Sequence, residues 1–371
     1  MPDPLVSLFL DAVRVDAQSL HERPMAEFIS NALAGLPLDI LEDDTAPKFG
    51  GSCGNLLCVP HGFDSTKPAI ALLAHMDTPR STAHVRPMIT DGRITSDGTT
   101  ALGVDNRAGT SILVQALRSA LSSGMRGNFL VVFTVAEELG PYGSRYLDLS
   151  PYNIKMCFVF DCSRRPGVFI RSAVGCSLYR ATFKGRAAHA AVAPEKGINA
   201  IHLAARALAD IRIGRHSPTM TSNIGKIVGG GATNVVPDQC IVEGEVREFD
   251  PDLINQHLAM LEAHFRSVAN DNGGGLEFST SVDFSPFRLK LDDPIVRTTV
   301  EVLQQVGAKP EPIEYLGGSD ANELNAKGIP AVNLGIGAQN PHGNDEFILI
   351  EDLHQSLKIA LALMERSQQL S

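Results

Sequence analysis

The sequence lacks the features that would place it in a membrane, outside the cell or on nucleic acid. No run approaches the ~20 apolar residues of a membrane-spanning helix, and residues 1–4 lack the basic start of a signal peptide. Lys and Arg number 32 against 42 Asp and Glu, a net charge of −10, whereas binding to phosphate groups needs clustered positive charge. We therefore expect a cytoplasmic protein with no membrane partner and no nucleic-acid partner.

The six cysteines form neither a Cys-x-x-Cys pair nor a dense framework. In a chain of 371 residues this spacing favours reduced, buried thiols over disulfides. Apolar residues, by contrast, are abundant: they make up 44% of the chain, so a sizeable core can form. The length suits two modules better than one.

Four short apolar segments are typical of strands that are buried on both faces of a sheet. They are residues 69–74, 129–136, 156–160 and 330–335. Between the first two, residues 106–122 carry apolar side chains at helical spacing, and residues 351–368 show a second amphipathic helix pattern. Strand, helix, strand in this order predicts a parallel α/β sheet.

The middle of the chain has a different pattern, in which strand-like segments are mixed with two helices. The predicted strands are residues 176–183, 221–228, 240–248 and 276–284, and the predicted helices are residues 197–211 and 251–269. This mixture predicts a small α+β domain inserted into the larger one. We place the inserted domain at residues 176–288 and the larger domain at residues 1–175 and 289–371.

Side chains that can bind metal ions follow the predicted buried strands, except that Asp105 stands where the helix between the first two strands begins and His342 lies in the loop after the fourth strand. The set is His75, Asp77, Asp105, Glu137, Glu138, Asp161 and His342. Any one carboxylate in such a place is usually a turn residue or a helix cap. In open parallel sheets, however, active sites gather beyond the carboxyl ends of the strands, so we expect these groups to meet in one cleft.

The composition of this set has a chemical logic. Two imidazoles and three carboxylates suit two zinc ions, and one carboxylate can bridge both ions. Asp77 lies two residues beyond His75 on an extended strand, so it points to the same side and can orient that imidazole. The side chains of Glu137 and Glu138 diverge, so one can bind metal while the other faces water.

These residues stand in stretches that resemble the dinuclear zinc peptidase family that includes peptidase T, carboxypeptidase G-type enzymes, succinyl-diaminopimelate desuccinylase and aminoacylase. The matching stretches are residues 73–79, 103–109, 134–140, 160–161, 317–320 and 341–346. The likeness extends from about Phe49 to Leu353 and is greatest to peptidase T-like members. It implies a phosphorylase/hydrolase-like catalytic domain with a mostly parallel central sheet, plus an inserted lid and dimerisation domain.

The resemblance also implies a role for each residue of the set. The implied ligands are His75 and Asp161 for one Zn²⁺, Glu138 and His342 for the other, and Asp105 for both. The bridging aspartate would be joined to Asn106 by a cis peptide bond. Asp77 would be the orienting carboxylate and Glu137 the general base. Co²⁺ or Mn²⁺ fits the same donors.

A rival family of dinuclear aminopeptidases shares the ligand set but inserts its second domain between the His-x-Asp strand and the bridging aspartate. Here the stretch from Asp77 to Asp105 is too short for a domain, and the insertion follows Asp161. This order favours the peptidase T-like topology. The same stretch is much shorter than in the tripeptidase proper, so the resemblance is to peptidase T-like relatives.

Three residues of the inserted domain match positions that act on substrate in the family. The resemblance implies that His189 stabilises the oxyanion of the reaction, across the interface of a homodimer formed through this domain. It implies that Asn234 and Arg247 bind substrate, and a guanidinium suits a carboxylate. Packing at a strand end is the alternative for His189, and a surface ion pair is the alternative for Arg247.

The expected activity is hydrolysis of an amide bond in short peptides, as an aminopeptidase of the tripeptidase type, by water that two zinc ions activate. An N-acyl-amino-acid amidohydrolase or a carboxypeptidase is the alternative, and the free terminus that the substrate must carry separates the two. A non-catalytic metal-binding protein is a remote alternative. Such a protein should lack a ligand or the base, and this sequence has the whole set.

Overall fold

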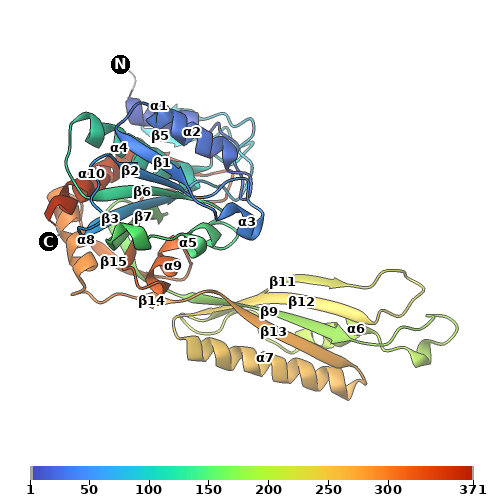
Figure 1. Cartoon of the computed structure of the whole chain (residues 1–371). Helices are drawn as coiled ribbons and strands as arrows, with labels where there is room; N and C mark the ends of the chain where they lie inside the picture. The colour runs from blue at the N-terminus through green and yellow to red at the C-terminus, as the bar shows by residue number, and fades with distance from the viewer. Residues whose placement is uncertain (1–2, 370–371) are drawn as a thin grey trace. The chain divides into compact units, whose positions relative to one another are not determined.

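The computed structural model describes residues 3–369, which divide into two compact units (Figure 1). Unit 1 comprises the chain up to Ser172, Arg288–Tyr315 and the chain from Ser319 onward, and unit 2 comprises Ala173–Phe287 and Leu316–Gly318. Within residues 3–369 no helix is long and apolar enough to cross a membrane. All six cysteines are free and buried, as predicted.

Unit 1 is built on a nine-stranded mixed sheet in the order β1-β2-β6-β3-β7-β16-β8-β14, with β15 paired to β8. The strands are β1 (Leu38–Glu42), β2 (Leu56–Pro60), β3 (Ala69–His75), β6 (Phe129–Thr134), β7 (Ile154–Cys162), β8 (Val168–Ala173), β14 (Phe287–Arg288), β15 (Glu311–Tyr315) and β16 (Ala331–Gly335). A separate three-stranded sheet has the order β17-β5-β4. Its strands are β4 (Met88–Thr90), β5 (Arg93–Thr95) and β17 (Phe347–Leu349).

The four central strands of the large sheet, β6, β3, β7 and β16, run parallel to one another. Every residue of β3, β6 and β16 is buried, which explains why their sequences are continuous apolar runs without alternation. The pairs β1–β2, β2–β6 and β8–β16 beside them are antiparallel. The predicted α/β architecture is therefore confirmed, with the parallel pairing in the centre of a mixed sheet.

Helices cover both faces of this sheet (Figure 1). They are α1 (Pro4–Ala12), α2 (Arg23–Leu33), α3 (Ala46–Phe49), α4 (Val104–Ser122), α5 (Tyr142–Tyr146), α8 (Pro294–Gln305), α9 (Asp320–Ala326) and α10 (Ile350–Arg366), with 3₁₀ turns at Ser150–Tyr152 and Ser367–Gln369. Helix α4 lies against β3 and contacts α1, α2 and α10, whereas α9 packs beside β7 and β16 and contacts α5. The predicted helices at residues 106–122 and 351–368 correspond to α4 and α10.

Unit 2 has its own antiparallel sheet, in the order β10-β11-β12-β9-β13. Its elements are β9 (Gly175–Lys184), α6 (Ala200–Ala209), β10 (Gly214–Arg215), β11 (Thr221–Gly229), β12 (Gln239–Glu248), α7 (Pro251–Asp271) and β13 (Gly275–Phe284), with a 3₁₀ turn at Pro194–Lys196. A separate core includes Phe183 of β9, Leu203 of α6 and Phe265 of α7. Helix α6 begins later than predicted because Asn199 caps it, accepting a hydrogen bond from the backbone N–H of His202, and it ends at Ala209.

Candidate active site

Several of the predicted site residues lie at the edge of the sheet where the parallel strands have their carboxyl ends. His75 is the last residue of β3 and pairs in register with Thr134, the last residue of β6. Asp161 lies at the end of β7, which runs parallel to β3. Asp105 stands at the start of α4, on the loop side of the same edge. The carboxyl ends of parallel strands meet at one edge, so these groups gather as predicted.

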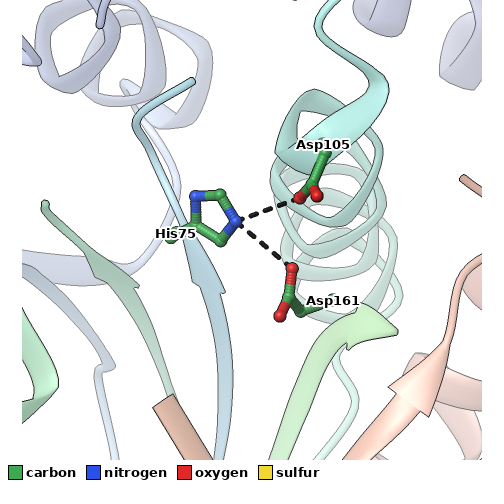
Figure 2. Close-up of side chains that lie close together, drawn as sticks. All are labelled: His75, Asp105 and Asp161. Atoms are coloured by element: carbon green, nitrogen blue, oxygen red, sulfur yellow. Dashed lines mark hydrogen bonds and ion pairs between the residues drawn. The ribbon is translucent and has the colours of Figure 1, made fainter. Parts of the chain in front are cut away.

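His75 faces two carboxylates with one ring nitrogen (Figure 2). Its Nε2 lies 3.1 Å from Asp105 Oδ1 and 3.2 Å from Asp161 Oδ1. Its Nδ1 lies 3.2 Å from Asp77 Oδ1, and the His75 side chain is only 1% exposed. A proton on Nδ1, donated to Asp77, leaves the Nε2 lone pair directed at the two carboxylates. Against the effect of burial, hydrogen bonds to Asp105, Asp161 and Asp77 raise the pKa of His75 well above its usual value, so either a proton on Nε2 or a bound metal cation can offset the charge of the carboxylates that face it.

A second group of ligand-type residues shares Asp105 with the first. His342 Nε2 lies 3.5 Å from Asp105 Oδ2 and 3.3 Å from Glu138 Oε1. The two oxygens of Asp105 therefore face different imidazoles, Oδ1 toward His75 and Oδ2 toward His342. The peptide bond from Asp105 to Asn106 is cis, as the resemblance implies.

Asp77 positions the backbone of Glu137 and Glu138 as well as the imidazole of His75. The carboxylate is fully buried, and its Oδ1 and Oδ2 accept the backbone N–H groups of Glu137 and Glu138, each at 3.1 Å. Ser19 Oγ donates to Asp77 Oδ2 at 2.7 Å. The orienting residue of the sequence analysis thus also holds the segment that carries both glutamates.

The crowded carboxylates of this cluster favour the binding of protons or metal cations among them. Burial raises the pKa of Glu137 well above its usual value, against the opposing charge of His75. Burial likewise raises the pKa of Glu138 to about 7. On the more exposed side, the adjacent carboxylates of Asp105 and Glu138 raise the pKa of His342 to about 10. Shifts of this size are typical of functional sites that bind cations.

The donor set fits a pair of divalent cations. Two ligands that each lie ~2.0–2.2 Å from a tetrahedral zinc ion are about 3.3–3.6 Å apart, close to the separations found here. Glu138 Oε1 is buried without a hydrogen-bond partner and lies 3.3 Å from His342 Nε2. A cation between these two atoms would satisfy both. The described residues contain three triads that could hold a metal ion: His75–Asp105–Asp161 and Asp105–Glu138–His342, which share Asp105, and His75–Glu137–Glu138.

The structure adds residues that the sequence analysis did not single out. Asn333 Nδ2 donates to Asp161 Oδ2 at 3.2 Å, and Asn106 Nδ2 donates to Asp161 Oδ1 at 3.3 Å. Glu346 Oε1 accepts the backbone N–H of His342 at 2.7 Å. The available signals were weak: Asn333 is a lone amide in an apolar strand, and Glu346 ends a stretch that resembles the family.

The comparisons with known proteins agree with this geometry. Residues 172–273 match the M20 peptidase dimerisation domain. The chain is 32% identical over 364 residues to the uncharacterized protein YqjE of Bacillus subtilis (strain 168), covering 98% of each. Aminopeptidase PepT from Bacillus cereus ATCC 10987 superposes over 98% of both chains, at 31% identity and a TM-score of 0.85. A tripeptidase from Staphylococcus aureus subsp. aureus Mu50 covers 99% of this chain and 98% of its own, at 30% identity and a TM-score of 0.89. The chain belongs to the M20 peptidase family.

Membership confirms the resemblance and the predicted class of activity. This M20 peptidase is a hydrolase, a metallopeptidase of the peptidase T type. Its catalytic fold, with a mixed central sheet, and its dimerisation domain are those of the family.

Unit 2 of the M20 peptidase carries the other three predicted site residues. His189 and Val235 form a bridge, and the backbone N–H of Ala190 donates to the carbonyl of Asn234, so His189 and Asn234 are neighbours. The exposed His189 ring accepts two backbone N–H groups on Nδ1, from Ala191 and from the residue after it, each at 3.2 Å. Its neutral form therefore carries the proton on Nε2, which is left free to donate.

Arg247 stands apart from these two residues, on β12. It forms a two-point ion pair with Glu245 of the same strand, through Nε at 2.9 Å and Nη2 at 3.0 Å. Its guanidinium lies 5.6 Å from the centre of the Phe284 ring. The ion pair that the sequence analysis held as the alternative is present, and the substrate-binding role stays a prediction.

Proposed function

We propose that this M20 peptidase hydrolyses the amide bond next to the N-terminal residue of short peptides, as an aminopeptidase of the tripeptidase type, with two Zn²⁺ ions as its cofactor. One observation carries the proposal: two ligand triads share Asp105, one through each oxygen. The names of its two structural relatives, an aminopeptidase and a tripeptidase, support the substrate class.

The residues of unit 1 divide between the two ions. His75 and Asp161 would hold one, Glu138 and His342 the other, and Asp105 both. When bound, a pair of divalent cations lowers the pKa of water and polarises the scissile carbonyl. The donors are oxygen and nitrogen atoms, so Co²⁺ or Mn²⁺ would fit the same site.

The remaining side chains orient groups and move a proton. Glu137 takes a proton on its carboxylate from the attacking water and gives it to the leaving amine. Glu137 must be ionised to take the proton, and cations bound beside it would favour that form against the burial that raises its pKa. Asp77 keeps the His75 tautomer and the backbone of both glutamates in place.

Unit 2 supplies groups for the substrate and the interface. The free Nε2–H of His189 suits donation to the oxyanion, and Asn234 beside it suits a polar contact to the substrate. Arg247 would exchange Glu245 for a substrate carboxylate. The match at residues 172–273 supports the placing of a lid and dimerisation domain at residues 176–288, and a homodimer through that domain. The six free cysteines are consistent with a cytoplasmic protein.

The general base is tested by Glu137→Gln. The variant keeps its shape but cannot take a proton, so we expect two metal ions per chain and a turnover at least ~10²-fold lower. Glu301→Gln, the same change at a surface ion pair, is the control and should leave turnover unchanged. Full activity of Glu137→Gln would remove Glu137 from the mechanism.

The alternative is an N-acyl-amino-acid amidohydrolase or a carboxypeptidase. Arg247 favours it, because a guanidinium suits the free carboxylate that those substrates share. Di- and tripeptides with either terminus blocked separate the two. An aminopeptidase requires the free α-amine and tolerates a C-terminal amide. Activity on N-acylated substrates with a strict need for the carboxylate would favour the alternative.

A further inference from the structure

The backbone N–H groups of the segment that carries both glutamates are held by side chains, whereas the carbonyls of residues 135–137 accept backbone N–H groups from residues 140–143. Strand β6 ends at Thr134, and the backbone N–H groups of residues 135–138 all donate to side chains from elsewhere in the chain. In chain order the acceptors are Asn55 Oδ1 (3.2 Å), Glu22 Oε1 (3.0 Å), Asp77 Oδ1 (3.1 Å) and Asp77 Oδ2 (3.1 Å). Three of these four acceptor atoms belong to carboxylates.

Glu22 is the carboxylate among them that neither the sequence analysis nor the mechanism uses. Its side chain is fully buried, and its Oε1 accepts the N–H of Leu20 at 2.8 Å as well as that of Ala136. Its Oε2 is buried without a hydrogen-bond partner. A carboxylate in this place costs free energy through desolvation, which the two backbone N–H groups on Oε1 partly offset.

Ala136 shows what the carboxylate holds. Its φ is +50°, in the left-handed region that residues with a β-carbon adopt rarely. This conformation turns the chain between the end of β6 and Glu137. Its N–H is buried with the residue, and Glu22 is the acceptor that the structure gives it. Without Glu22 this buried N–H would lose its acceptor, and the turn would rest on the hydrogen bonds to its carbonyls alone, so the direction of the next side chain would be less strictly set.

We propose that Glu22 is a positioning residue for Glu137: by accepting the N–H of Ala136 it sets the turn that aims the general base. The inference rests on the proposed role of Glu137. Glu138 is less dependent on Glu22, because Asp77 Oδ2 holds its N–H and a bound metal ion would hold its carboxylate. Loss of Glu22 should therefore impair proton transfer more than metal binding.

Three substitutions at Glu22 distinguish the effect of the position of the acceptor oxygen from the effect of the negative charge. Glu22→Ala removes the acceptor, Glu22→Asp keeps the charge but withdraws it by one methylene, and Glu22→Gln keeps an Oε1 acceptor. We expect the first two to lower kcat at least tenfold, with KM within threefold and two metal ions per chain. Glu22→Gln should restore most of kcat. Equal losses in Glu22→Gln and Glu22→Ala, or loss of metal in step with activity, would overturn the inference.

A neighbouring residue provides the matched control. Arg23 follows Glu22 in the chain and ties the same segment down, through a two-point ion pair to Glu42 and a bond to the Ser52 carbonyl, but does not contact Ala136. Arg23→Ala should leave kcat within twofold. A loss like that of Glu22→Ala would show that any loosening of this segment has the same effect.

A double-mutant cycle tests whether Glu22 acts through Glu137. In the native background Glu22→Ala lowers turnover, and in the Glu137→Gln background it should lower it no further. A further loss of the same factor would mean that Glu22 acts by another route, with the role of Glu137 intact. Full activity of the single variant Glu137→Gln would instead contradict the proposed function, so the two failures are distinguishable.

Hydrogen exchange gives a readout that does not depend on residual activity. In metal-loaded protein, Glu22→Ala and Glu22→Asp should speed amide exchange in residues 135–138, whereas exchange in β2 should stay as in the native protein. Glu22→Gln should retain protection. Unchanged exchange in residues 135–138 of Glu22→Ala would refute the proposal, whatever the kinetics show.

Discussion

At the scale of single residues, the interior of unit 1 contains carboxyl groups whose charge is costly. Glu22 is the clearest case, because burial raises its pKa to about 7 and the charge of Asp77 adds to the effect. In an unfolded chain the same group titrates near ~4.3. Between these two values the folded protein binds more protons than the unfolded chain does.

This difference predicts a pH dependence of stability. Because the folded state holds the extra proton, the free energy of unfolding falls as pH rises from about 4.5 to 7, by up to about 3 kcal/mol from Glu22. Glu22→Gln removes this contribution, so its unfolding free energy should fall less over that range. Urea unfolding of the metal-free native and variant proteins at pH 5 and pH 8 measures the slopes. Parallel slopes would contradict the raised pKa.

The sequence predicted the seven residues of the unit 1 cluster because each stands near the end of a parallel strand or the start of the helix between two of them. It did not indicate Glu22 or Ser19. These side chains reach the site from a loop between α1 and α2, and their partners lie 58 to 114 positions away in the chain. Such a contact leaves no periodic trace in a single sequence.

At the scale of elements, the close approach of α4 to β7 sets the distance between Asp105 and Asp161. Asn106 fixes this approach, since its Nδ2 donates to the Phe160 carbonyl at 2.8 Å and its Oδ1 accepts the N–H of Gly109 at 2.9 Å. A β-carbon at Gly109 would lie 2.2 Å from the Phe160 carbonyl oxygen. Only glycine fits this contact.

We therefore expect Gly109→Ala to push α4 away from β7. The loss of close packing should lower the free energy of unfolding by about 2–3 kcal/mol and weaken metal binding, because Asp105 moves with the helix. Ser119→Ala, on the half-buried outer part of α4, should change stability by no more than about 0.5 kcal/mol. Denaturant midpoints and zinc titration check both. A native midpoint and native zinc binding in Gly109→Ala would refute the argument.

The central strands and the long helices were predictable from apolar continuity and helical spacing. The flanking strands β1 and β15 were not, because they are largely exposed and their patterns are too short to stand out. The predicted second strand, 129–136, ended too late: β6 stops at Thr134, where side chains replace strand partners for the backbone.

At the scale of the whole molecule, the two units differ in what stabilises them. Unit 2 has a continuous apolar core around Phe183 and Phe265. Unit 1 has an apolar core as well, but it also brings five carboxylates and two imidazoles together at one edge of its sheet. The mutual repulsion of these carboxylates opposes folding unless cations are bound.

Metal removal should therefore act on unit 1 alone. We expect chelation to lower the melting temperature and to speed hydrogen exchange around residues 73–77 and 135–138, while the core of unit 2 keeps its protection. Zn²⁺ at a hundredfold excess over its dissociation constant at one of the two sites should restore about 2.7 kcal/mol. Equal loosening of both units would contradict the assignment of the ions to unit 1.

The two-module organisation was predictable from chain length and from the change of pattern after residue 175. What the sequence did not show is that Leu316–Gly318, far along the chain, belong to unit 2. The backbone of Gly318 lies so close to the Phe284 ring that a β-carbon would come within 2.4 Å of it. The domain limits at residues 176 and 288 stay a prediction.

The backbone N–H groups of residues 135–138 bond to side chains that are distant in the sequence, and this matters for any attempt to transfer the active site to another protein. A graft of the paired glutamates into another α/β scaffold would import the reactive groups without the side chains at positions 22, 55 and 77 that hold the amides of residues 135–138. The recipient backbone would have to be redesigned around three separate anchor points. A transfer of this active site must therefore include residues from several separate parts of the chain, because no single contiguous segment contains them all.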